Sequence, residues 1–104
     1  MHPTYLEELA QEIRSSVPSG VLPGEDTTDL FVMYAVLLLA KGGQVSTENV
    51  HNAWVGWMIS RGEQHASMVP LAELSPETQA KDSPFVVAIR SVAQKLSAGG
   101  SRVG

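Results

Sequence analysis

The sequence predicts an all-α protein, a compact bundle of four helices plus one short helix. Apolar residues recur at intervals of three and four along most of the chain, and no segment of useful length alternates apolar with polar residues. Helix-capping residues, glycine or proline bound each periodic segment. At 104 residues the chain fits one domain, which we place at residues 1–98, with a flexible tail at 99–104.

The first helix is predicted for residues 4–17. Thr4 and Glu7 have the spacing of a capping box, and one-sided apolar residues follow them. The next stretch, VPSGVLPGED, contains two prolines and two glycines, which interrupt regular structure, so we expect a loop there. We expect Leu22 of this loop to reach the core.

The second helix should begin near Asp26 and Asp29, whose negative charges suit a helix N-terminus, and end at Lys41 before a Gly-Gly pair. Its run LFVMYAVLLLA, at 30–40, is apolar in all directions. We therefore expect this helix to be the most deeply buried and to pack at the centre. As a helix the run would be about 16 Å long, roughly half the thickness of a bilayer's hydrocarbon, so we expect no membrane span.

The third helix should be capped by Ser46 or Thr47 and end near Arg61, because Gly62 follows at a position that commonly ends helices. Two more helices begin with a capping residue followed by proline, which favours the first helical position. One is a short helix near 75–80. The last helix begins where Asp82 or Ser83 precedes a proline, and the glycine-containing segment after it should fray.

His51 lies in the middle of the apolar face of the third helix, where a polar side chain needs a partner. Two interpretations are open. In the first, His51 is a neutral core imidazole that donates to a backbone carbonyl of the 62–70 connection. In the second, it belongs to a pocket with an aromatic wall and a few polar groups, of the kind small ligands use, lined by His51, Trp54, Arg61 and His65.

Composition disfavours several function classes. The formal net charge of −4 and the scattered basic residues argue against nucleic-acid binding. Without cysteine there is no disulfide, thiolate nucleophile or zinc-thiolate site, and no two histidines stand three or four residues apart, the spacing that forms a metal-binding pair on a helix. The N-terminus lacks the pattern of a signal peptide, so we expect a cytoplasmic protein without metal or cofactor.

The order VHNAW, Gly62, HASMVPLAEL and KDSPF, within residues 45–90, resembles the repeat of ryanodine receptors, the RyR domain. The matching positions are His51 and Trp54 on the helix, His65, Val69 and Pro70 in the loop, and Glu73, Leu74 and Asp82 after it. Ala66 departs from the family's usual proline. The resemblance implies a noncatalytic module of bacterial or phage type, for a nucleotide-derived ligand in defence or signalling.

Two functional hypotheses follow. The first is a binding module for a small polar or nucleotide-like ligand, to which Arg61 and Lys81 would supply positive charge. Its expected ligand-binding residues are His51, Trp54, Arg61, His65, Glu73, Lys81 and Asp82. The alternative is a homo-oligomer that self-associates through apolar helix surface, chiefly that of the second helix. An enzyme has the least support, because no nucleophile, base and orienting group can be assembled.

Overall fold

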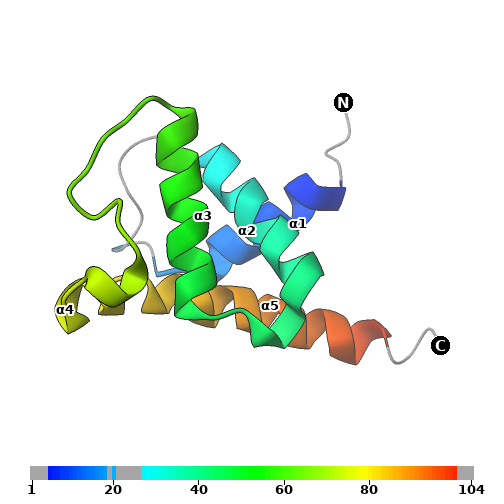
Figure 1. Cartoon of the computed structure of the whole chain (residues 1–104). Coiled ribbons are helices and arrows are strands. Elements are labelled where there is room, and N and C mark those ends of the chain that lie inside the picture. Colours follow the sequence, from blue (N-terminus) through cyan, green and yellow to red (C-terminus); the bar gives the residue numbers. More distant parts are fainter. Residues whose placement is uncertain (1–4, 19, 21–26, 101–104) are drawn as a thin grey trace.

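The computed structural model describes residues 5–18, 20 and 27–100. Its elements are α1 (Tyr5–Ser16), α2 (Thr28–Lys41), the 3-10 turn η2 (Gly42–Gln44), α3 (Thr47–Ser60), the 3-10 turn η3 (Leu71–Glu73), α4 (Pro76–Ala80) and α5 (Ser83–Gly100) (Figure 1). These ranges contain four longer helices, one short helix and no strand, which confirms the all-α prediction. No helix of the described residues is both long and apolar enough to cross a membrane.

The helix α2 lies at the centre of the bundle, where it packs against α1, α3 and α5. Figure 1 shows α5 running along the base of the molecule, with α3 standing almost at right angles to it. The core joins side chains from all four long helices. Its fully buried members include Ile13, Phe31, Tyr34, Val50, Ile89 and Val92.

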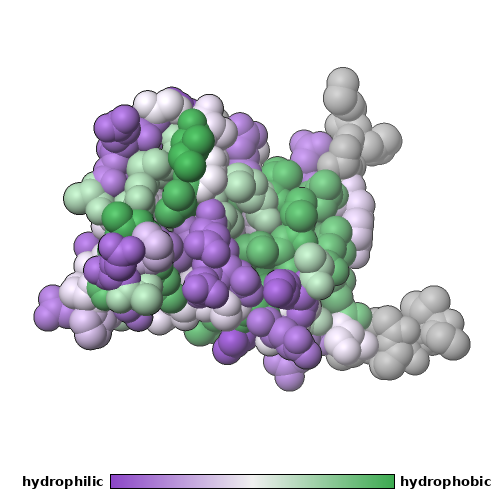
Figure 2. Space-filling view, in the orientation of Figure 1, coloured by the Kyte–Doolittle hydropathy of each residue, from purple (hydrophilic) through white to green (hydrophobic). Residues whose placement is uncertain are grey.

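Although α2 is apolar on all sides, one of its faces is not covered. Val36 and Leu39 are 50% and 51% exposed, while Tyr34 and Ala35 are completely buried. Figure 2 shows the resulting hydrophobic surface over α2. The prediction that this helix is the most deeply buried therefore holds only for its inner face. Its three neighbours, α1, α3 and α5, do not enclose it on every side.

Local capping signals are confirmed where the structure describes them. Ser46 accepts a hydrogen bond from the Asn49 backbone, and the Asn49 side chain accepts one from the Ser46 backbone, which forms a capping box. Gly62 adopts a φ of +70° just after α3, a conformation that favours glycine. Ser75 caps α4 as expected.

Other boundaries differ from the prediction or cannot be compared. Thr27, without a side-chain capping bond, precedes α2, and the expected roles of Thr4, Leu22 and Asp26 lie outside the described residues. The helix α5 continues to Gly100, past the expected domain end at residue 98. Glycine lowers helix propensity by only about 1 kcal/mol per residue, so a helix that is already formed can extend over it.

Candidate functional site

A cleft of about 620 Å³ lies where α3, the short helix α4 and the start of α5 meet. Its walls are largely apolar and aromatic. They are formed by Leu30 and Tyr34 of α2, Trp54 and Trp57 of α3, Leu74, and Phe85 of α5. The polar groups of the cleft come from His51, His65, Ser67, Glu77, Thr78, Lys81 and Asp82.

His51 ties the floor of the cleft to the 62–70 connection. Its ring is only 2% exposed, and Nε2 lies 2.6 Å from the carbonyl oxygen of Val69. Because a carbonyl can only accept, Nε2 carries the proton and donates it. This confirms the interpretation of His51 as a core imidazole bonded to the connection. The same ring also lines the cleft, so the two interpretations of His51 are compatible.

The second ring nitrogen of His51 faces a carboxyl group. Nδ1 lies 3.8 Å from Oδ2 of Asp82, which is longer than a hydrogen bond, and the contact is an ion pair only when the ring is protonated. Burial raises the pKa of Asp82, and His51 lowers it by a smaller amount. Asp82 precedes α5, where its backbone carbonyl accepts hydrogen bonds from Phe85 and Val86, so the helix start positions the carboxyl group at the cleft.

Tyr34 reaches the cleft from the core side of α2. Its ring packs edge-on against Phe31, with centroids 5.3 Å apart, and lies 5.7 Å from the ring of Phe85. Burial, and to a lesser degree the charge of Asp82, raise the pKa of Tyr34 well above its ordinary value. The phenol therefore stays protonated and neutral at physiological pH.

Trp54 is held between two histidine rings. Its indole stacks on His51 at a centroid distance of 5.9 Å and meets His65 edge-on at 5.5 Å. His65 is itself oriented by the backbone of Ser67, which donates to Nδ1 over 3.0 Å. His65 therefore contacts Trp54, which in turn contacts His51.

The side chain of Gln79 holds the far end of the same segment. Its Nε2 donates to the carbonyl oxygens of Leu71, at 3.0 Å, and Leu74, at 2.9 Å. Together with the contacts of His51 and Trp54, these bonds attach the segment after α3 at both ends. These contacts join the segment to both α3 and α4.

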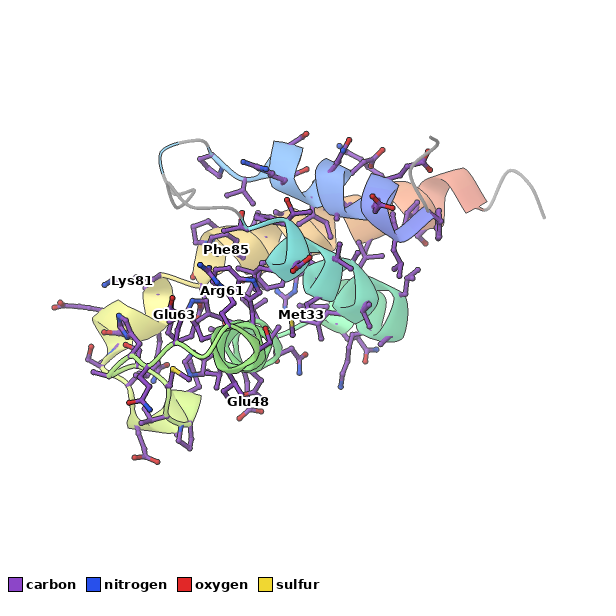
Figure 3. All side chains as sticks on the ribbon, turned by 90° about the horizontal axis from the view of Figure 1, so that it is seen from above. Met33, Glu48, Arg61, Glu63, Lys81 and Phe85 are labelled. Atoms are coloured by element: carbon purple, nitrogen blue, oxygen red, sulfur yellow. The ribbon has the colours of Figure 1, made fainter. Side chains whose placement is uncertain are left out.

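Five of the seven expected ligand-binding residues line the cleft: His51, Trp54, His65, Lys81 and Asp82. Arg61 and Glu73 do not. The Arg61 guanidinium lies 4.5 Å over the ring of Trp57, and Glu73 lies exposed in η3. Figure 3, which looks along α3, shows Arg61 and Lys81 on the side of the helix that faces Phe85.

Sequence reasoning missed Tyr34, Trp57 and Phe85 as cleft residues. All three belong to periodic apolar helix faces, where an aromatic residue is ordinarily core. Tyr34 and Phe85 line the cleft because α2 and α5 meet behind α3, a packing arrangement that no local pattern indicates. Among the described residues, no three His, Asp or Glu side chains are grouped so as to hold a metal ion.

Residues 4–94 match the model of a family described as a domain of unknown function (DUF7701). This finding overturns the resemblance to the ryanodine receptor repeat, which nothing in the comparison indicates. The motif residues that suggested it have structural roles in this fold, since His51 binds Val69 and Pro70 directs the chain into η3. No curated protein and no solved structure matches the chain.

Replacing His51 should loosen the connection. His51→Phe keeps a buried ring but removes the donor to Val69, so we expect the free energy of unfolding to fall by about 1–3 kcal/mol. Urea denaturation followed by circular dichroism measures this change. The control His65→Phe keeps the exposed ring beside Trp54 and should change stability by less than about 0.5 kcal/mol. Equal losses in the two variants would contradict the role of the His51 bond.

Asp82 should make stability depend on pH. Because its pKa is raised in the fold, the folded chain binds more protons than the unfolded chain between the ordinary aspartate pKa and the raised value. The free energy of unfolding should therefore fall as pH rises through this interval. Urea denaturation at a series of pH values should show a flatter profile for Asp82→Asn.

The control for the pH experiment is Asp29→Asn, which removes an exposed carboxylate in the first turn of α2. In this variant the free energy of unfolding should fall with rising pH as steeply as in the original chain. An Asp82→Asn profile as steep as that of the original chain would show that Asp82 does not cause the decline.

Proposed function

Because the chain belongs to the family of a domain of unknown function (DUF7701), we propose its function from its own geometry: it is a noncatalytic module that binds a small molecule in the cleft between α3, α4 and α5. The observation that carries this proposal is a cleft of about 620 Å³ with aromatic walls and polar groups at its base and rim. Small-ligand sites have this combination of size and lining.

The contacts among the wall residues support a binding role. Trp54 is clamped by His51 and His65, and the segment behind it is attached by Gln79. A ligand that enters would not have to order these groups, so little binding free energy is lost to conformational entropy.

The noncatalytic part of the proposal rests on the state of the polar groups. His51 Nε2 donates its proton to a main-chain carbonyl, which removes that nitrogen as a general base. Tyr34 keeps its proton, since burial opposes the phenolate. Nε2 of His51 and the hydroxyl of Tyr34 can orient a ligand, but neither is placed to accept a proton from it.

The hypothesis that the ligand is derived from a nucleotide has lost much of its support. It depended on the ryanodine receptor resemblance, which is wrong, and on positive charge from Arg61 and Lys81. Only Lys81 of these two lines the cleft. Binding of a nucleotide stays a prediction.

Both tryptophans of the chain line the cleft, so their indole Nε1–H signals in NMR report on it directly. We expect a screen of aromatic fragments to yield binders that shift the Trp54 signal. Ala80→Phe, which fills the cleft from an exposed position, should weaken them by about tenfold or more. The control Ala72→Phe, exposed in η3, should not. Fragments that leave both indole signals unmoved would contradict the proposal.

A second candidate function is self-association through α2. The observation that favours it is the apolar outer face of this helix, where Val36 and Leu39 are about half exposed. A groove of about 380 Å³ beside that face is lined by Met33, Leu37 and Ala53, among others. Extended apolar surfaces of this kind are typical of contacts between protein chains.

Sedimentation of the chain over a range of concentrations tests this second candidate. We expect a dimer whose dissociation constant rises by about tenfold or more in Leu39→Lys, because a buried contact would then hold an unpaired charge. The control Val87→Lys places the same charge on an exposed position of α5. A monomer at every concentration would remove this candidate.

A further inference from the structure

We infer that the cleft selects a flat aromatic ligand that carries a positive charge. The inference rests on the proposed function, since it names the ligand class for the same cleft. The geometry places a carboxyl group and partly exposed aromatic rings around one hollow, and both attract cations for different physical reasons.

The charged groups of the cleft favour a cation. Asp82 and Glu77 supply two carboxyl groups. Among the described residues that line the cleft, Lys81 is the one lysine, and there is no arginine. Both Glu77 and Lys81 are exposed at the rim, where water screens their charges. Asp82 is more enclosed, with an exposed side-chain fraction of 18%, so its field inside the cleft is the stronger one.

Asp82 has capacity for a further partner. A carboxylate can accept several hydrogen bonds, yet its contact with His51 Nδ1, at 3.8 Å, is too long to be one. Burial without full compensation is also what raises the pKa of this group. A positively charged donor at the base of the cleft would stabilise the ionised form.

The aromatic walls provide a second attraction. Ring faces carry partial negative charge and bind cations, more strongly where water is excluded. This chain already uses the effect, since the Arg61 guanidinium lies 4.5 Å over Trp57. Trp54 and Phe85 are only partly buried and line the cleft, so their surfaces remain open to a ligand.

A flat ring suits the same walls, because aromatic pairs gain free energy beyond that of the area they bury. The cleft of about 620 Å³ has room for a ring with a short charged chain. A phosphate or carboxylate group, in contrast, would be repelled by Asp82. The ligand class is therefore an aryl-alkyl amine or a protonated heterocycle.

Three probes with one ring and different charges test the inference: 2-phenylethylamine, 2-phenylethanol and 3-phenylpropionate. Binding is measured by the shifts of the Trp54 and Trp57 indole signals. We expect the amine to bind about tenfold or more tightly than the propionate, with the alcohol between them. In Asp82→Asn the preference of the amine should largely disappear, while the affinity for the alcohol stays within about twofold.

The matched control is Glu48→Gln. Glu48 is an exposed carboxylate of the same helix, α3, and Figure 3 shows it on the side opposite Lys81 and Phe85. This variant changes the net charge by the same amount and should keep the preference for the amine. If Asp82→Asn fails to fold, Glu77→Gln at the rim replaces it and should reduce the preference by a smaller factor.

The outcomes separate this inference from the proposed function. Equal binding of the three probes, or tighter binding of the propionate, would overturn the ligand class and leave the binding module standing. The ligand class also falls if other aromatic fragments move the indole signals while the amine does not. If neither the probes nor any fragment moves these signals, both proposals fall.

Discussion

One hydrogen bond, from the buried imidazole of His51 to the carbonyl of Val69, organises the fold around the cleft. A polar ring in the apolar face of α3 must be paired, since an unpaired buried donor costs about 1–3 kcal/mol. The partner lies in the 62–70 connection, so satisfying the ring also fixes the connection against α3. The cleft is formed on the side of His51 that this bond leaves open.

The same imidazole is one of several ionisable groups at the cleft. Its other nitrogen faces Asp82 at the start of α5, and Tyr34 approaches from α2. Three ionisable groups, from α3, from α2 and from the turn before α5, thus share a partly closed space. Desolvation dominates the outcome, because it raises the pKa of both Asp82 and Tyr34. The result is a group of polar side chains beneath aromatic walls.

The size of the bundle limits what it can bury. With α1, α3 and α5 on its inner sides, α2 still leaves Val36 and Leu39 about half exposed. Within residues 5–18, 20 and 27–100 no further helix covers them. The cleft and the outer face of α2 are separate surfaces, so a small ligand and a second copy of the chain would not compete for the same residues.

The helices and most of their ends follow from the sequence alone, because capping bonds such as that of Ser46 join residues within one turn. The sequence also indicates that His51, in an apolar helix face, needs a polar partner, but it leaves open whether that partner is a carbonyl of the 62–70 connection or a ligand. Three other features arise only when the helices pack: Tyr34 and Phe85 face the cleft, Arg61 covers Trp57 instead, and one side of α2 stays open. Those outcomes depend on which helices lie side by side, and contacts between residues far apart in the chain leave no periodic pattern in it.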